Sequence, residues 1–172
     1  MAITRSQTRF GKEMPSFDQG KPGYDRLVNS LQSDDVIPSL IQTAEVAVTV
    51  AEMLAVRATP KTLVAAPGSG YALQFISAVF IYDYAAAFTE TDDNLAIRYT
   101  DGSGTVVSLT LETTGFLDAT ADKISTIGRL ATDVLVTANA ALVLHNTGNG
   151  ELGGTGSVCR VKVSYRVIAT GL

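Results

Sequence analysis

The sequence predicts an all-β protein, an antiparallel β-sandwich preceded by an extended N-terminal arm. The most informative observation is the segment 158–168, in which apolar and polar residues alternate over the full length of a strand. Similar short runs recur from about residue 41 onward with turn signals at short intervals, which is typical of a sandwich. The composition agrees, with 15 glycines, no tryptophan and a hydrophobic share of 46% that is enough to form a core. We therefore expect an arm with a short helix over residues 1–40 and a β-sandwich domain over residues 41–172.

The expected arm is basic, whereas the body is acidic. Residues 1–23 show no hydrophobic period, and residues 24–31 place apolar residues at the spacing of one short helix. Residues 1–26 hold five basic and three acidic residues, and the rest of the chain holds eight basic and fourteen acidic ones. A basic arm on an acidic body suggests an arm that meets a partner, and a merely solvated terminus is the alternative. The residues expected to contact that partner are Arg5, Arg9, Phe10, Lys12, Phe17, Lys21, Tyr24 and Leu27.

The first half of the sandwich contains three expected strands. Residues 46–51 alternate valine with alanine and threonine, and residues 62–66 form a second run that the Pro-Gly-Ser-Gly turn at 67–70 stops. Residues 71–84 are apolar on both faces, which predicts a long central strand.

The second half contains a hairpin and several shorter strands. Residues 95–99 alternate, Asp101-Gly102 is a hairpin signal, and Val107, Leu109 and Leu111 are expected to face one way. Gly115 could form a bulge or a bend. The remaining candidates are strands at 123–127, 134–137 and 141–145, followed by a glycine-dense turn at 148–156.

The final strand has one apolar and one basic face. Its apolar side carries Cys159, Val161, Val163, Tyr165 and Val167. Its polar side carries Arg160, Lys162, Ser164 and Arg166. A nucleic-acid surface would need a broader basic patch with interleaved aromatic residues, so we favour a solvated or subunit-contacting face and expect no nucleic-acid partner.

The residue types that usually carry chemistry are scarce. The letters GNGELG at 148–153 match a dinucleotide-binding loop, but that loop must open a helix and strands flank this one. The acidic cluster Glu90, Asp92 and Asp93 lacks the spacing of a calcium loop and favours a solvated turn. His145 and Cys159 are the only histidine and cysteine, and each is expected to be packed rather than catalytic. We expect no enzymatic activity, no cofactor and no metal, although a carboxylate pair for sugar hydrolysis stays open.

The chain has no predicted membrane segment. Residues 71–88 are the most apolar stretch, but Gln74 and Asp83 interrupt it, and a spanning helix needs about 20 predominantly apolar residues. Met1 is followed by polar and charged residues, so no signal peptide is expected. We expect a soluble protein with no membrane partner.

Five segments together resemble small structural proteins of tailed bacteriophages, over roughly residues 62–168. They are L-V-A-A-P-G-S-G at 63–70, I-Y-D-Y at 81–84, L-A-I-R-Y at 95–99, D-G-S-G-T at 101–105 and G-G-T-G-S-V-C-R-V-K-V-S-Y-R-V at 153–167. The resemblance implies a jelly-roll sandwich and a capsid decoration (cement) protein, often a homotrimer, that binds the major capsid protein on the virion surface. It also implies synthesis in the cytoplasm of the host bacterium.

Two other classes of function stay open. One is a tail-tip, fibre or receptor-binding module of the same virion that contacts a glycan, but the expected loops are rich in Gly, Asp, Asn and Thr rather than in aromatic residues that stack on sugars. The other is a glycan hydrolase on a sandwich scaffold, for which no recognisable motif is present.

Overall fold

The structure, a computed structural model, describes residues 40–89 and 94–171, and the structural statements below concern this part of the chain. Its elements are β1 (Gln42–Val48), α2 (Val50–Leu54), β2 (Lys61–Val64), β3 (Tyr71–Asp83), β4 (Phe88–Thr89), β5 (Asn94–Tyr99), β6 (Leu111–Glu112), β7 (Lys123–Gly128), β8 (Leu142–Asn146), β9 (Gly153–Gly154) and β10 (Val158–Ala169). The predicted all-β class is therefore confirmed.

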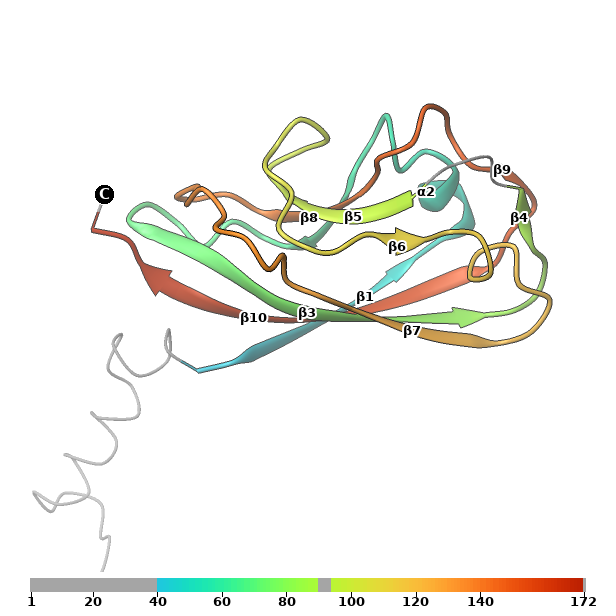
Figure 1. Ribbon diagram of the computed structural model, residues 1–172, viewed down its shortest axis with the longest axis horizontal. Coiled ribbons are helices and arrows are strands. Elements are labelled where there is room, and N and C mark those ends of the chain that lie inside the picture. Colours follow the sequence, from blue (N-terminus) through green and yellow to red (C-terminus); the bar gives the residue numbers. More distant parts are fainter. Residues whose placement is uncertain (1–39, 90–93, 172) are drawn as a thin grey trace, which may run out of the picture. The chain divides into compact units, whose positions relative to one another are not determined.

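Eight of the strands form two four-stranded antiparallel sheets in the orders β1-β10-β3-β7 and β2-β8-β5-β6. Figure 1 shows them as two layers, with β1, β10, β3 and β7 below and β5, β6 and β8 above. Among these eight strands the first pairs with the last, the second with the seventh, the third with the sixth and the fourth with the fifth. That pairing is a long hairpin rolled up on itself, which is the jelly-roll arrangement.

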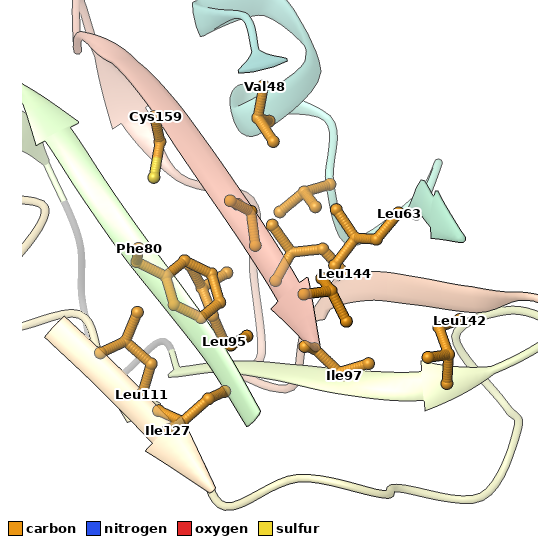
Figure 2. Close-up of a cluster of buried hydrophobic side chains, with 14 of the residues drawn as sticks. Val48, Leu63, Phe80, Leu95, Ile97, Leu111, Ile127, Leu142, Leu144 and Cys159 are labelled. Atoms are coloured by element: carbon orange, nitrogen blue, oxygen red, sulfur yellow. The ribbon is translucent and has the colours of Figure 1, made fainter. Parts of the chain in front are cut away.

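The core lies between the two sheets and is formed by the inward-facing residues of both. The side chains labelled in Figure 2 are Val48, Leu63, Phe80, Leu95, Ile97, Leu111, Ile127, Leu142, Leu144 and Cys159. The rings of Phe80 and Phe116 meet edge to face with centroids 6.3 Å apart, a geometry that adds to the energy of apolar burial. Cys159 is fully buried, as expected for a small core residue.

Strands β3 and β10 are the two central strands of one sheet. They pair from Asp83 opposite Val158 to Tyr71 opposite Ala169, with one register shift between Ser164 and Tyr165. The predicted long central strand is confirmed, because β3 has β10 on one side and β7 on the other. The buried residues of β10 before the register shift are Cys159, Val161 and Val163, which agrees with the predicted alternation.

The first predicted strand ended too late. β1 ends at Val48, and Val50 begins a five-residue helix instead of continuing the alternation. The cause is a capping box, in which the Thr49 hydroxyl accepts from the Glu52 N–H (3.3 Å) and a Glu52 carboxylate oxygen accepts from the Thr49 N–H (2.9 Å).

Two further strand predictions were wrong. Residues 134–137 form no strand, and residues 107–111 do not keep one apolar face because Leu109 is exposed and Ser108 is buried. The chain changes sheets here. The Val107 N–H donates to Ile97 of β5 (2.9 Å), and two residues later the Leu109 N–H donates to Gly128 of β7 (2.8 Å). Such a crossing interrupts the two-residue alternation of a single strand.

Candidate interaction surface

The predicted partner-binding residues cannot be placed. Arg5, Arg9, Phe10, Lys12, Phe17, Lys21, Tyr24 and Leu27 lie outside the described residues, as do Glu90, Asp92 and Asp93. Within the described ranges no group of three or more His, Cys, Asp or Glu side chains is arranged to hold a metal ion. No helix in the same ranges is long and apolar enough to cross a membrane.

His145 is a packed residue of β8, with 7% of its surface exposed. The turn after β5 folds over it so closely that a Cβ on Gly102 would lie 2.6 Å from Nε2. Arg98 of β5 holds this turn by donating to the Gly102 carbonyl (2.7 Å). Burial, followed by the positive charges of Arg98 and Arg57, lowers the pKa of His145, so the imidazole is neutral at pH 7.

An open cleft of about 670 Å³ lies beside His145. The carboxylates that line the cleft accept hydrogen bonds from main-chain N–H groups. The two oxygens of Glu151 accept from the N–H groups of Arg57 (3.0 Å) and Ala58 (2.7 Å). These bonds tie the loop after α2 to the loop before β9. Glu151 therefore has a structural role in this cleft.

Ser103, Asp101 and His145 border the same cleft, but they are not arranged as a catalytic relay. The Ser103 hydroxyl donates directly to Asp101 (2.7 Å), and the same oxygen of Asp101 accepts from the Ser103 N–H (2.8 Å). In a Ser-His-Asp relay the histidine lies between the other two residues. The observed bonds instead form an Asx turn that shapes the loop after β5.

The Cys159 thiol is an unreactive part of the core. Burial raises the pKa of this thiol to about 12, so the nucleophilic thiolate is absent at neutral pH. The glycine-rich segment 148–153 leads into β9 and opens no helix, in agreement with its interpretation as a loop.

A partly enclosed cavity of about 180 Å³, lined by both polar and apolar residues, lies where the segment 129–136 passes the start of β3. Leu73, Tyr99 and Val136 contribute to its wall, and Arg129 and Asp133 are its charged residues. The exposed side chains of Leu135 and Val136 come from the same segment. This is the region that was expected to form a strand; Val134 is partly buried against the core, whereas the next two residues are exposed.

The outer face of the β1-β10-β3-β7 sheet is a further candidate surface. No other described element covers it, as the free lower side of this layer in Figure 1 shows. The pairing registers place Arg160 of β10 beside Ile81 of β3, and Ile81 beside Ile124 of β7. Ile124 is 71% exposed, although it lies in a regular strand.

The rows on either side of Ile81 each combine charged residues with a valine, Val79 in one row and Val158 in the other. Lys162 of β10 lies beside Glu45 of β1, and their charged groups are 3.2 Å apart. Both side chains are well exposed, so this ion pair contributes little to stability. In the other direction Val158 lies beside Asp83. A shallow groove of about 310 Å³ runs among Ile81, Asp83, Ile124 and Arg160.

The sequence indicated only part of this surface. The basic, solvated side of the last strand was predicted, and Arg160 and Arg166 are indeed exposed. The apolar centre was not predicted, because Ile81 and Ile124 become neighbours only through the pairing of β3 with β7. The available signal for this apolar centre was Ile124, the isoleucine at an exposed position of the predicted strand 123–127. Comparison with protein-family models, with curated proteins and with solved structures finds no match.

Proposed function

We propose that this chain is a virion structural protein of a tailed bacteriophage, a capsid decoration protein that binds and stabilises the shell of major capsid protein. Its role in this proposal is structural rather than enzymatic. The observation that carries the proposal is the jelly-roll pairing of the two sheets, because it agrees with the fold that the sequence resemblance implied, although many functions share this fold.

The proposed contact with the capsid combines the basic N-terminal arm and the sandwich. Ordering an arm on binding costs about 1–2 kcal/mol per residue in conformational entropy. Burial of Phe10, Phe17, Tyr24 and Leu27 would offset this cost, and the basic residues would meet an acidic partner. The homotrimer that the resemblance implies enters the same proposal as a three-fold contact between copies of the chain.

Antibody–gold labelling of intact virus particles from the source tests the location. Label over the head supports the decoration function. Label confined to the tail would favour the alternative, a tail-tip, fibre or receptor-binding module. Particles without label, with the protein present only in the infected cell, would overturn both.

Deletion of residues 1–23 tests the arm. We expect the shortened chain to keep the far-UV circular dichroism of the β-sandwich and to lose binding to capsids that lack the protein. The matched control replaces Phe10 and Phe17 by alanine in the full chain, which removes two anchors without changing the arm's charge. Full capsid binding by the shortened chain would contradict the role of the arm.

A further inference from the structure

We infer that the outer face of the β1-β10-β3-β7 sheet binds a second copy of this chain about a two-fold axis. The inference goes beyond the proposed function, because it concerns how copies of the chain meet rather than how they meet a capsid. It rests on the arrangement of apolar and charged side chains around Ile81.

The centre of the face is apolar. Ile81 and Ile124 lie side by side on β3 and β7, and Val79 precedes Ile81 by two residues on the same side of β3. Val158 lies diagonally from Ile81 on β10 and is 40% exposed. Burying such residues would stabilise a contact by roughly 25 cal/mol for each Å² of apolar surface removed from water.

Opposite charges flank this centre diagonally. Arg160 is beside Ile81, and Asp83 is two residues further along β3, beside Val158. Both side chains are exposed, and within residues 40–89 and 94–171 neither one forms an ion pair or a side-chain hydrogen bond. Around Ile81 the face therefore offers Arg160 and Asp83 as a cation and an anion that the described fold does not use.

This arrangement is complementary to itself. Strands lie about 4.8 Å apart and rise about 3.4 Å per residue, so Arg160, Ile81, Asp83 and Val158 form the corners of a rectangle. A two-fold axis between two facing sheets, running near the diagonal from Val158 to Ile81, places Arg160 of each copy opposite Asp83 of the other. The same axis brings Ile81 and Ile124 of both copies together, and the strands of the two copies then cross steeply, as in orthogonal sheet packing.

A second copy fits these charges better than the chain's own N-terminal arm does. Residues 1–26 are net basic, so they could pair with Asp83 but would leave Arg160 facing further positive charge. A second copy pairs both residues twice, once on each side of the axis. Because a two-fold contact uses the same patch on both partners, it predicts an assembly with an even number of chains.

The first experiment is charge reversal in the full-length chain, with mass measured by sedimentation or light scattering. We expect the unmodified chain to form a dimer, or a hexamer if three-fold contacts are also present. Arg160→Asp and Asp83→Arg each place like charges opposite one another, so each should weaken the contact at least about tenfold. The double variant Arg160→Asp with Asp83→Arg should restore the assembly.

A monomer or trimer of the unmodified chain would overturn the proposal, and so would a double variant that folds but stays dissociated. Ile124→Lys supplies an independent test, because it places a charge in the apolar centre and should dissociate the assembly. The matched control is Leu135→Lys, since Leu135 is 79% exposed and belongs to the segment before β8. Equal effects of the two substitutions would contradict a specific role for this face.

Crosslinking identifies the occupant directly. Ile124→Cys introduces an accessible thiol, whereas the native Cys159 is fully buried and should not compete for the reagent. A photo-crosslinker on this thiol should join two chains and map to β3, β7 or β10 of the second copy. Crosslinks within one chain to residues 1–39 would instead identify the arm as the occupant and overturn the proposal. Neither result depends on the capsid experiments, so the two proposals can fail separately.

Discussion

His145 makes the stability of the sandwich depend on pH in one direction. Its pKa is lowered in the folded chain by burial and by neighbouring arginines, whereas in the unfolded chain it is near 6.5. As the pH falls below about 6.5, the unfolded chain takes up a proton that the folded chain resists, so the free energy of unfolding decreases. Above about 6.5 the imidazole is neutral in both states and has no such effect.

We therefore expect urea denaturation midpoints of the unmodified chain to be lower at pH 5 than at pH 7. His145→Gln cannot take up the proton and should show a smaller decrease over the same range. The pH 7 midpoint of the variant gives the packing cost of the substitution separately. An identical pH dependence in both proteins would contradict this assignment.

Gly156 is required by the close approach of a ring. Its φ is +56°, and a Cβ at this position would lie 2.0 Å from Phe88. Gly156→Ala should therefore lower the free energy of unfolding by about 1–3 kcal/mol through overpacking, with backbone strain in addition. Gly150→Ala is the control from the same glycine-rich region, because a Cβ there meets no atom within 4 Å. Equal denaturation midpoints for the two variants would show that the Phe88 ring can move aside without a loss of stability.

Cys159 should report the opening of the core. Because its side chain is fully buried and its thiol pKa is raised to about 12, a disulfide reagent should not modify it in the native protein at pH 8. One equivalent should react after full denaturation. Rapid reaction under native conditions would indicate that β10 separates from the sheet more often than its central position suggests.

At the scale of elements, α2 shows how a local hydrogen-bond pattern overrides a hydrophobic one. The Glu52 carboxylate is bound by the Lys61 ammonium group and by the main chain and hydroxyl of Thr49, and these contacts lower its pKa to about 2. The carboxylate contributes to stability above its unfolded value of about 4.5, and this contribution is lost as the pH falls towards 2.

Thr49→Ala should cost about 1 kcal/mol in the free energy of unfolding, because it removes the hydroxyl of the capping box. Chemical denaturation at pH 7 measures this value. Thr43→Ala is the control, since Thr43 is an exposed residue of β1 outside the helix. A loss no larger than that of the control would mean that neighbouring packing, rather than the cap, positions α2.

Strand positions were predictable where one strand keeps one environment along its length. Residues 71–83 and 158–168 do so; the first segment was identified because both of its faces are apolar, and the second by its alternation. Residues 107–111 pass from one sheet to the other, and Val50 follows a helix cap, so alternation misled at both places. A reading of Thr49 and Glu52 as a capping box would have corrected the second error.

At the scale of the molecule, neither strand order nor the candidate surface could be predicted, because both depend on pairing between distant residues. Gln42 pairs with Tyr165, and the apolar centre of the outer face forms only when β3 lies between β10 and β7. A single sequence shows which side of each strand is apolar but not which strands are neighbours. Exposed isoleucine and unpaired arginine become informative only after the register is known.

The same long-range pairing makes β10 the strand on which the fold depends. It lies between β1 and β3, so its removal would leave both strands with an unpaired edge and would open the core at Val161 and Val163. Deletion of residues 158–172 should therefore abolish cooperative unfolding in urea, as measured by circular dichroism. Deletion of residues 171–172 alone is the control and should leave the transition intact. A cooperative transition in the chain lacking β10 would show that the other sheet, β2-β8-β5-β6, is stable by itself. Because β1 pairs with β10, which is distant in the sequence, refolding of the full chain should take milliseconds to seconds rather than microseconds.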